Sequence, residues 1–135
     1  MAFQFSTTTR NASLDAIETA IGTSAILRLR TGSVPANCGT ADSGTVVATI
    51  NLPSDWMAAA SGGSKAASGT WQDTSADASG TVGHFRIYDS GGTVCHIQGT
   101  VTVNGGGGDM TLDNIAVNSG QQVTISSFTI SAGGA

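Results

Sequence analysis

Two histidines and a neighbouring cysteine are the residues of this chain best suited to binding a metal ion. His84 and His96 are the only histidines, and they lie in two adjacent segments with strand-like alternation. With a third ligand they could hold zinc, because a zinc site needs at least three imidazole, thiolate or carboxylate groups. Cys95 is the nearest candidate, but the alternation along its strand directs it toward the core. We therefore expect a cross-strand surface pair and no metal site.

The acidic residues offer two pairs that could act as general acid and base. Asp73 and Asp77 lie in a loop-like tract, and Asp109 and Asp113 flank a short predicted strand. No apolar pattern predicts burial of either pair, and burial is what shifts the pKa of a catalytic carboxylate. The chain also lacks the nucleophile-elbow, dinucleotide-binding, phosphate-loop and zinc-protease motifs. We expect no catalytic residue, no cofactor and no enzyme activity.

A run of four glycines at residues 105–108 resembles part of a phosphate-binding loop. It lacks the lysine that such a loop places on the phosphates. We interpret the run as a flexible hairpin loop.

The large aromatic residues and the cysteines leave alternatives open. Trp56, Trp71 and Tyr88 could form a platform for stacking sugars, or they could anchor the core or a subunit contact. The opening sequence, MAFQFSTTTR, lacks the charged-then-apolar order of a signal peptide, so we expect no Sec export. In a chain that is not exported, Cys38 and Cys95 are expected to be reduced and buried.

Composition and charge exclude several classes of protein. The 135 residues correspond to one domain, and Gly, Ala, Thr and Ser supply about half of them. No apolar run approaches the roughly 18 residues of a membrane helix. The net charge is −4 and the five basic residues form no cluster, so nucleic acid is not an expected partner.

One helix is predicted, close to the start of the chain. Leu14, Ile17 and Ile21 recur at helical spacing, and Gly22 provides a stop. The side chains available to cap its beginning are Thr9, Asn11 and Ser13. We expect about three turns that cover an apolar surface.

The remainder of the chain alternates with period two and predicts short strands separated by turns. The central hairpin joins residues 81–89 to residues 93–103. A three-residue loop with a left-handed glycine would pair Ile87 with Cys95 and Phe85 with Ile97, which places these four residues in the core. The opposite, outer face would then hold His84, Arg86, Tyr88, His96 and Gln98.

The last strand changes phase, because Val123 and Ile125 lie on one parity and Phe128 and Ile130 on the other. One extra residue at Ser126–Ser127 would restore a common face, which predicts a β-bulge. In all, seven or eight short strands predict an all-β, antiparallel β-sandwich or jelly roll with one short N-terminal helix. We expect a single domain over residues 1–135, with an arm and helix at 1–23 and the sandwich at 24–135.

Four segments together resemble a family of small proteins encoded in the structural modules of tailed phages and prophages. The segments are residues 84–93 (HFRIYDSGGT), 98–101 (QGTV), 109–114 (DMTLDN) and 120–130 (GQQVTISSFTI). The similarity covers about the last two-thirds of the chain. It lies in scaffold patterns rather than in catalytic motifs.

Within that family, the size, acidity and expected jelly roll are most similar to those of a head decoration, or cement, protein. The resemblance implies a non-enzymatic virion protein that sits on the capsid surface and bridges subunits of the major capsid protein. Such a protein would be made in the cytoplasm of the host bacterium and would act as a dimer or trimer. The alternative is a tail-fibre or receptor-binding sandwich that recognises a cell-surface glycan. A glycan hydrolase is a third hypothesis, but the sequence shows no convincing pair of catalytic acids for it.

Four residues are the candidates for partner contacts. Phe3 and Phe5 alternate with polar residues in the N-terminal stretch. Arg28 and Arg30 lie on one face of a predicted strand with no acidic residue beside them in the sequence. They could reach acidic residues of the capsid, or they could be solvated charges that protect a strand edge from aggregation.

Overall fold

The computed structural model describes residues 3–134 and contains one helix, α1 (Thr7–Ile21). The Ser6 hydroxyl accepts a hydrogen bond from the Thr9 amide, so the helix begins earlier than the predicted caps at Thr9, Asn11 and Ser13. It ends as predicted at Gly22, whose φ of 92° favours glycine. The helix therefore has four turns instead of three, and it buries Leu14 and Ile21.

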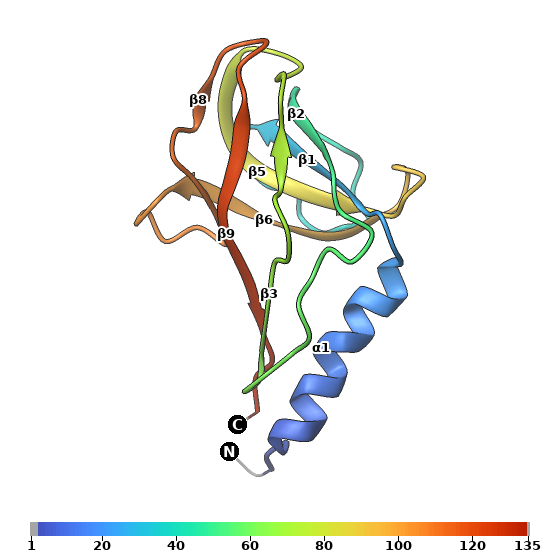
Figure 1. Ribbon diagram of the computed structural model, residues 1–135. Helices are drawn as coiled ribbons and strands as arrows, with labels where there is room; N and C mark the ends of the chain where they lie inside the picture. Colours follow the sequence, from blue (N-terminus) through green and yellow to red (C-terminus); the bar gives the residue numbers. More distant parts are fainter. Residues whose placement is uncertain (1–2, 135) are drawn as a thin grey trace.

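Nine strands follow the helix and form one curled, mixed sheet that makes a half-barrel (Figure 1). Their bounds are β1 (Ile26–Thr31), β2 (Val46–Asn51), β3 (Ser64–Ala66), β4 (Gln72–Asp73), β5 (Gly80–Tyr88), β6 (Cys95–Val103), β7 (Met110–Leu112), β8 (Ala116–Val117) and β9 (Val123–Ser131). The hydrogen-bonded order is β2-β1-β5-β6-β7-β9-β3, with β4 on β9 and β8 on β5. The all-β class with one N-terminal helix is confirmed, whereas the sandwich or jelly-roll arrangement is not.

The glycine run explains one departure from the expected antiparallel topology. β6 and β7 pair in parallel, although only residues 104–109 connect them. Gly105 and Gly107 both have φ of 83°, and a Cβ at Gly106 or Gly108 would lie within 2.9 Å of Thr102. Only glycines allow so tight a parallel return. The run is therefore a compact crossover rather than the flexible hairpin loop predicted from the sequence.

The core lies inside the curl of the sheet. Leu27, Leu29 and Ile87 are fully buried on the inner face of β1 and β5. Four aromatic rings in the core contact one another in series. The distances between ring centroids are 6.1 Å for Trp56 and Trp71, 5.7 Å for Trp71 and Phe128, and 5.3 Å for Phe128 and Phe85. Because both tryptophans are at most 2% exposed, they are core residues and not a platform for sugars.

The central hairpin has a different register from the one predicted. Phe85 pairs with Gly99, Ile87 with Ile97 and Tyr88 with Cys95, and a bulge separates the last two pairs. The Phe85 ring lies over Gly99, where a Cβ would come within 2.8 Å of the ring. Phe85 thus pairs with the small residue Gly99, which is two positions after the expected partner Ile97. Phe85 and Ile87 are in the core as predicted, but Cys95 is only half-buried and outside it.

The predicted bulge in the last strand is confirmed. Thr111 pairs with Ser127 and Leu112 pairs with Ile125, so Ser126 is the extra residue in β9. The bulge lets both Val123 and Phe128 be buried.

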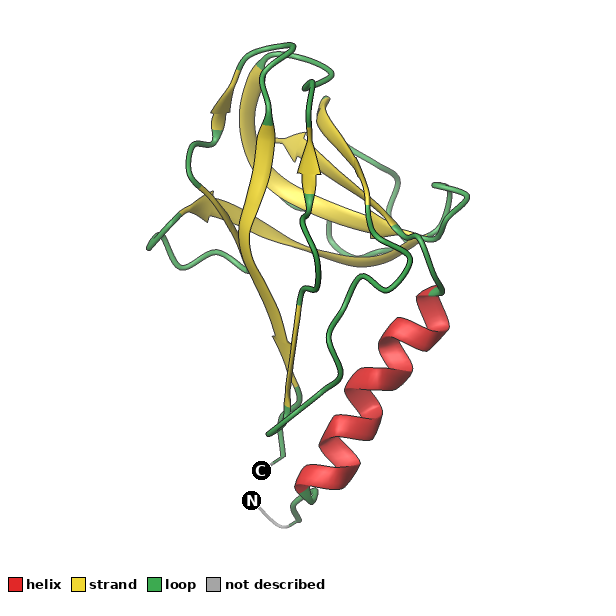
Figure 2. Ribbon diagram, viewed as in Figure 1, coloured by secondary structure: helices red, strands yellow, loops and turns green. Residues whose placement is uncertain are grey.

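The helix does not cover a face of the half-barrel. It lies beside the lower ends of the strands, where β3 and the end of β9 leave the barrel together (Figure 2). We call α1, β3 and residues 128–131 the stalk. Both ends of the described chain lie at its far end (Figure 1).

Candidate functional site

The four candidate partner-binding residues lie in two separate places. Phe3 and Phe5 are at the free end of the stalk, and Arg28 and Arg30 are in β1 of the half-barrel (Figure 1). The 15 residues of α1 separate them, which corresponds to about 22 Å of helix. They cannot form one site within one chain.

The end of the stalk exposes an aromatic pair. Phe3 is 64% exposed and Phe5 is 47% exposed, and their rings meet edge to face at 5.6 Å. The Phe5 amide donates to the Gly134 carbonyl at 2.6 Å, so the two ends of the chain are tied together. A hollow of about 210 Å³, lined by Phe5, Arg10 and Ala132 among others, lies beside them. We call Phe3, Phe5 and residues 132–134 the tip.

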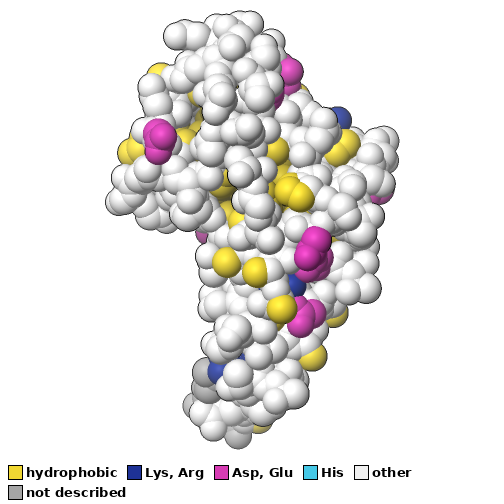
Figure 3. All heavy atoms as spheres, in the orientation of Figure 1, with side chains coloured by type: hydrophobic (Ala, Val, Ile, Leu, Met, Phe, Trp, Pro, Cys, Tyr) yellow, Lys and Arg dark blue, Asp and Glu magenta, His cyan; other side chains and the backbone are white. Residues whose placement is uncertain are grey.

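A buried lysine fixes the helix to the strands. Lys65 in β3 is 3% exposed, and its Nζ lies 2.6 Å from Asp15 and 2.9 Å from Glu18, both on α1. Burial by itself would lower the pKa of Lys65, but the hydrogen bonds with the two carboxylates outweigh it and raise the pKa. Figure 3 shows acidic side chains on the flank of the molecule where α1 lies.

Further bonds make this attachment rigid. The Asp15 carboxylate also accepts from the Ala60 amide, and the Asn11 side chain accepts from the Gly63 amide. At the other end of the helix, the Trp56 indole donates to the Gly22 carbonyl. The tip is therefore held at a fixed position relative to the half-barrel.

The face of β5 that the sequence placed outside the core is covered by another segment. The β1–β2 loop, residues 32–45, packs over it. Arg86 is 2% exposed and donates to Asp42 at 2.8 Å, to the Asn37 carbonyl at 3.0 Å and twice to Gln98. The Gln98 amide donates in turn to the Pro35 carbonyl at 2.7 Å. Both faces of β5 are thus buried.

Asp42 is the centre of this cover. Its carboxylate accepts from Arg86 and from the Tyr88 hydroxyl at 2.6 Å, and it forms an ion pair with Arg30 at 3.1 Å. Desolvation opposes ionisation of Asp42, but the hydrogen bonds from Tyr88 and Arg86 and the charges of the arginines lower its pKa overall. Burial and the bond to Asp42 raise the pKa of Tyr88.

The expectation that Arg28 and Arg30 lack a local acidic partner is wrong for Arg30. Arg30 is only 6% exposed and is paired with Asp42, 12 residues further along the chain. Arg28 is half-buried, lies 4.7 Å over the Tyr88 ring and donates to the Gly92 carbonyl. Within residues 3–134, no carboxylate forms an ion pair with Arg28. Arg28 is the residue of the two that can reach a partner.

The histidines do not form the expected surface pair. His84 is fully buried, and its Nδ1 lies 3.0 Å from the Gly32 carbonyl, whereas His96 is exposed. Within the described chain no three His, Cys, Asp or Glu residues lie close enough together to hold a metal ion. Both thiols are free, and the Cys95 thiol donates to the Ile97 carbonyl, while the nearby Cys38 thiol contributes to the raised pKa of Cys95.

The acidic pairs from the sequence stabilise turns and edges. Asp73 and Asp77 accept from the amide and the hydroxyl of Thr49, respectively. Asp109 accepts from the amide and hydroxyl of Thr100 at the edge of β6. The sequence offered no signal for these bonds or for the roles of Asp42 and Lys65, because their partners are from 9 to 50 positions away along the chain.

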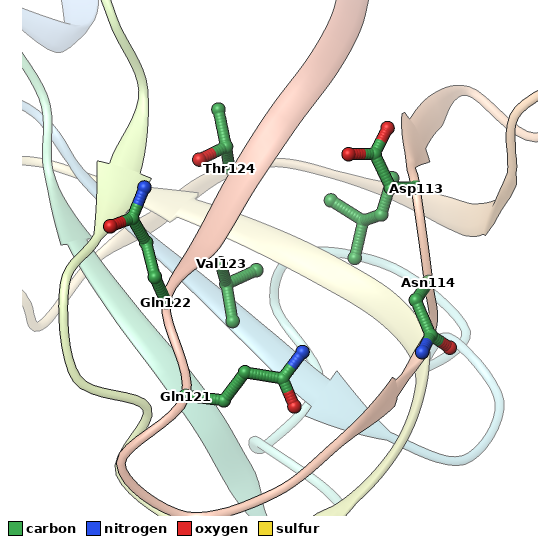
Figure 4. Close-up of a pocket in the computed structure, with 7 residues that line it drawn as sticks. Asp113, Asn114, Gln121, Gln122, Val123 and Thr124 are labelled. Atoms are coloured by element: carbon green, nitrogen blue, oxygen red, sulfur yellow. The ribbon is translucent and has the colours of Figure 1, made fainter.

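A hollow of about 220 Å³ lies between the end of β7 and the start of β9. Gln121 extends toward Asn114 on the facing segment, while Gln122 points to the other side (Figure 4). Asn114 accepts from the Ala116 amide and Gln121 accepts from the Asn118 amide, so both side chains complete turns. The hollow has polar walls but no pair of groups placed for catalysis.

No protein family, curated protein or solved structure matches the chain. Within the described residues, no helix has the length and apolar character needed to cross a membrane.

Proposed function

We propose that the protein is a non-enzymatic structural protein of a tailed phage, a decoration or cement protein that bridges subunits of the major capsid protein on the outside of the head. The observation that carries the proposal is the braced stalk. It holds an exposed aromatic pair, Phe3 and Phe5, at a fixed distance from the half-barrel. The phage assignment itself is supported by the resemblance of residues 84–93 and 120–130 to the tailed-phage family.

The internal charges support a structural role. Arg30 and Arg86 are buried and paired with Asp42, and Lys65 is buried between Asp15 and Glu18. Each cluster fixes one segment to another: the β1–β2 loop to the sheet, and the helix to β3. Side chains used in this way stabilise a shape, and a clamp across subunit seams requires a fixed shape.

The hairpin between β5 and β6 is the proposed contact with the capsid. Arg28 lies against this hairpin through Gly92, and Val94 beside it is 50% exposed. Within the described residues Arg28 forms no ion pair, and an exposed apolar side chain next to such an arginine suits an acidic, partly apolar patch on the shell. In this proposal the half-barrel is the body that contacts the capsid, the role that the sequence analysis gave to a sandwich or jelly roll.

Binding to undecorated phage heads tests the proposal. We expect the purified protein to bind heads and Arg28→Ser to weaken binding and reduce its salt dependence, because the partner's charge is no longer met. Asp55→Asn is the matched control, since Asp55 is exposed. If Arg28→Ser binds heads as tightly as the wild type and with the same salt dependence, this contact is excluded. Attachment to tails instead of heads would favour the receptor-binding alternative.

A further inference from the structure

The sheet has a gap between β6 and β9. The three residues of β7 join these two strands, and beyond β7 they diverge (Figure 1). The divergence leaves a hollow of about 310 Å³ between the first half of β6 and the last residues of β9. We call this hollow the cleft.

On the side of β9 that faces the cleft, no strand of the described chain pairs with the residues after Phe128. The Ala67 amide donates to the Phe128 carbonyl, and the Ala132 amide donates to the Gly63 carbonyl. In an antiparallel pair, alternate residues turn their backbone groups toward the partner strand. Residues 128, 130 and 132 therefore face β3, and the backbone groups of Thr129 and Ser131 face the cleft.

The β6 side is an edge of the same kind. The Thr100 amide donates to the Asp109 carboxylate, away from β5, so the backbone groups of Gln98 two residues earlier also point away from β5. Asp109 closes the upper end of this edge. Below it, the cleft is bounded by backbone donors and acceptors on both sides, and such edges accept an added strand.

The floor of the cleft is apolar. Phe85 and Phe128 lie at its base, and Ile97 and Ile130 line it while remaining only partly buried. Figure 3 shows hydrophobic side chains exposed where the molecule narrows from the half-barrel to the stalk. An added strand would therefore have to present apolar side chains at every second position.

Residues 3–5 of the chain, which we call the arm, have that pattern. Phe3 and Phe5 alternate with Gln4, and Ser6 after them has extended backbone angles, φ −64° and ψ 160°. Both rings are about half exposed or more, although aromatic side chains of this size are the most favourable to bury. The arm lies next to residues 132–134, directly beyond the lower end of the cleft.

We propose that the arm of a second copy of this chain inserts into the cleft as an added strand, with Phe3 and Phe5 on the apolar floor. Within one copy the arm is bonded to Gly134 and its rings stay exposed. Reciprocal exchange between two copies would bury both pairs of rings and pair both open edges, as in an isologous dimer. The inference agrees with the dimer or trimer that the resemblance implies, and it does not depend on capsid binding.

The oligomeric state of the full chain is the first test. We expect sedimentation velocity to show a dimer that dissociates on dilution, and Phe3→Ala/Phe5→Ala to be monomeric while its circular dichroism spectrum stays that of the folded wild type. Val103→Ala is the matched control, because Val103 is 42% exposed and lies outside the cleft. A wild-type chain that is monomeric at all concentrations, or a double variant that still forms the dimer, would overturn the proposal.

Photo-crosslinking locates the arm without deleting it. Benzoylphenylalanine replaces Phe3, and ¹⁴N- and ¹⁵N-labelled chains are mixed so that crosslinks between chains are recognised by mass. We expect crosslinks between chains to residues 97–98 and 128–131. Crosslinks between chains that map elsewhere would overturn the cleft assignment, and binding of such a chain to phage heads would leave the capsid role intact.

Discussion

Arg86 on β5 and Asp42 in the β1–β2 loop lie 2.8 Å apart, although 44 positions separate them in the sequence. The same carboxylate accepts a hydrogen bond from the Tyr88 hydroxyl and forms an ion pair with Arg30. One acidic side chain thus compensates two buried guanidinium groups and holds the loop over the outer face of the sheet. Removing it would leave two buried cations without a carboxylate.

Asp42→Asn is predicted to destabilise the protein by about 2–3 kcal/mol. This is less than the roughly 3–5 kcal/mol for a fully buried pair, because the Asp42 side chain is 42% exposed. Chemical denaturation measures the change, and Asp55→Asn, at an exposed position, serves as the control. If both variants unfold at the wild-type midpoint, the loop is not held by this carboxylate.

Acidic pH should remove the contribution of Asp42 to the stability of the protein. The folded-state pKa of Asp42 is below its ordinary value of 3.8, so its contribution to stability is present above pH 3.8 and is lost as the pH falls through the folded pKa. We predict that Asp42→Asn flattens the acid limb of a plot of unfolding free energy against pH. An acid limb of the same slope in the variant would contradict this.

Alkaline pH should destabilise the fold through Cys95. Burial and the neighbouring Cys38 thiol raise the pKa of Cys95 from 9.0 to about 12. The folded chain therefore holds the Cys95 proton more tightly than the unfolded chain. The stability that this difference contributes is complete below pH 9 and is lost between pH 9 and 12, which chemical denaturation at these pH values would measure.

Shielding of the Cys95 thiol is tested by its reactivity. We expect iodoacetamide to react slowly with Cys95 in the folded protein at pH 8 and rapidly after denaturation. Equal rates would show that the thiol is not shielded.

Truncation of Phe85 tests the central packing. Phe85 is 1% exposed, lies over Gly99 and contacts Phe128 edge to face. Phe85→Ala is predicted to cost about 3–5 kcal/mol of unfolding free energy. Val103→Ala, at a position that is 42% exposed, is the control and should melt like the wild type. A soluble Phe85→Ala chain with unchanged melting would refute the observed hairpin packing.

The attachment of the helix depends on Lys65. Lys65→Ala removes the partner of Asp15 and Glu18 and opens a space at the junction of α1 and β3. We predict that limited proteolysis then cleaves near residues 22–24 much faster than in the wild type, while the strands stay protected. Arg10→Ala is the comparison, because Arg10 is on the same helix but forms no ion pair within the described residues. Equal cleavage of all three chains would show that Lys65 does not hold the helix.

Local patterns predicted the elements better than their arrangement. The phase change between Ile125 and Phe128 located the bulge, and Gly22 located the end of the helix, because both depend on neighbouring residues. The register of the hairpin was missed because parity fixes which side chains share a face but not which pairs oppose, and here Phe85 selects Gly99.

The candidate site shows the same division. Exposure of Phe3 and Phe5 agrees with their place in a polar N-terminal stretch. Burial of Arg30 and Arg86 could not be predicted, since it depends on a loop that folds back from residues 32–45. Asp42 is the one charged residue of the loop at residues 32–45, and nothing near it in the sequence indicates that role.

The location of the protein on purified virions tests the capsid role most directly. Density for the half-barrel and stalk on the outer surface of the head, repeated across subunit seams with the symmetry of the shell, is the result we predict from cryo-electron microscopy. Density for the protein at the tail or its tip, with bare heads, would contradict the account.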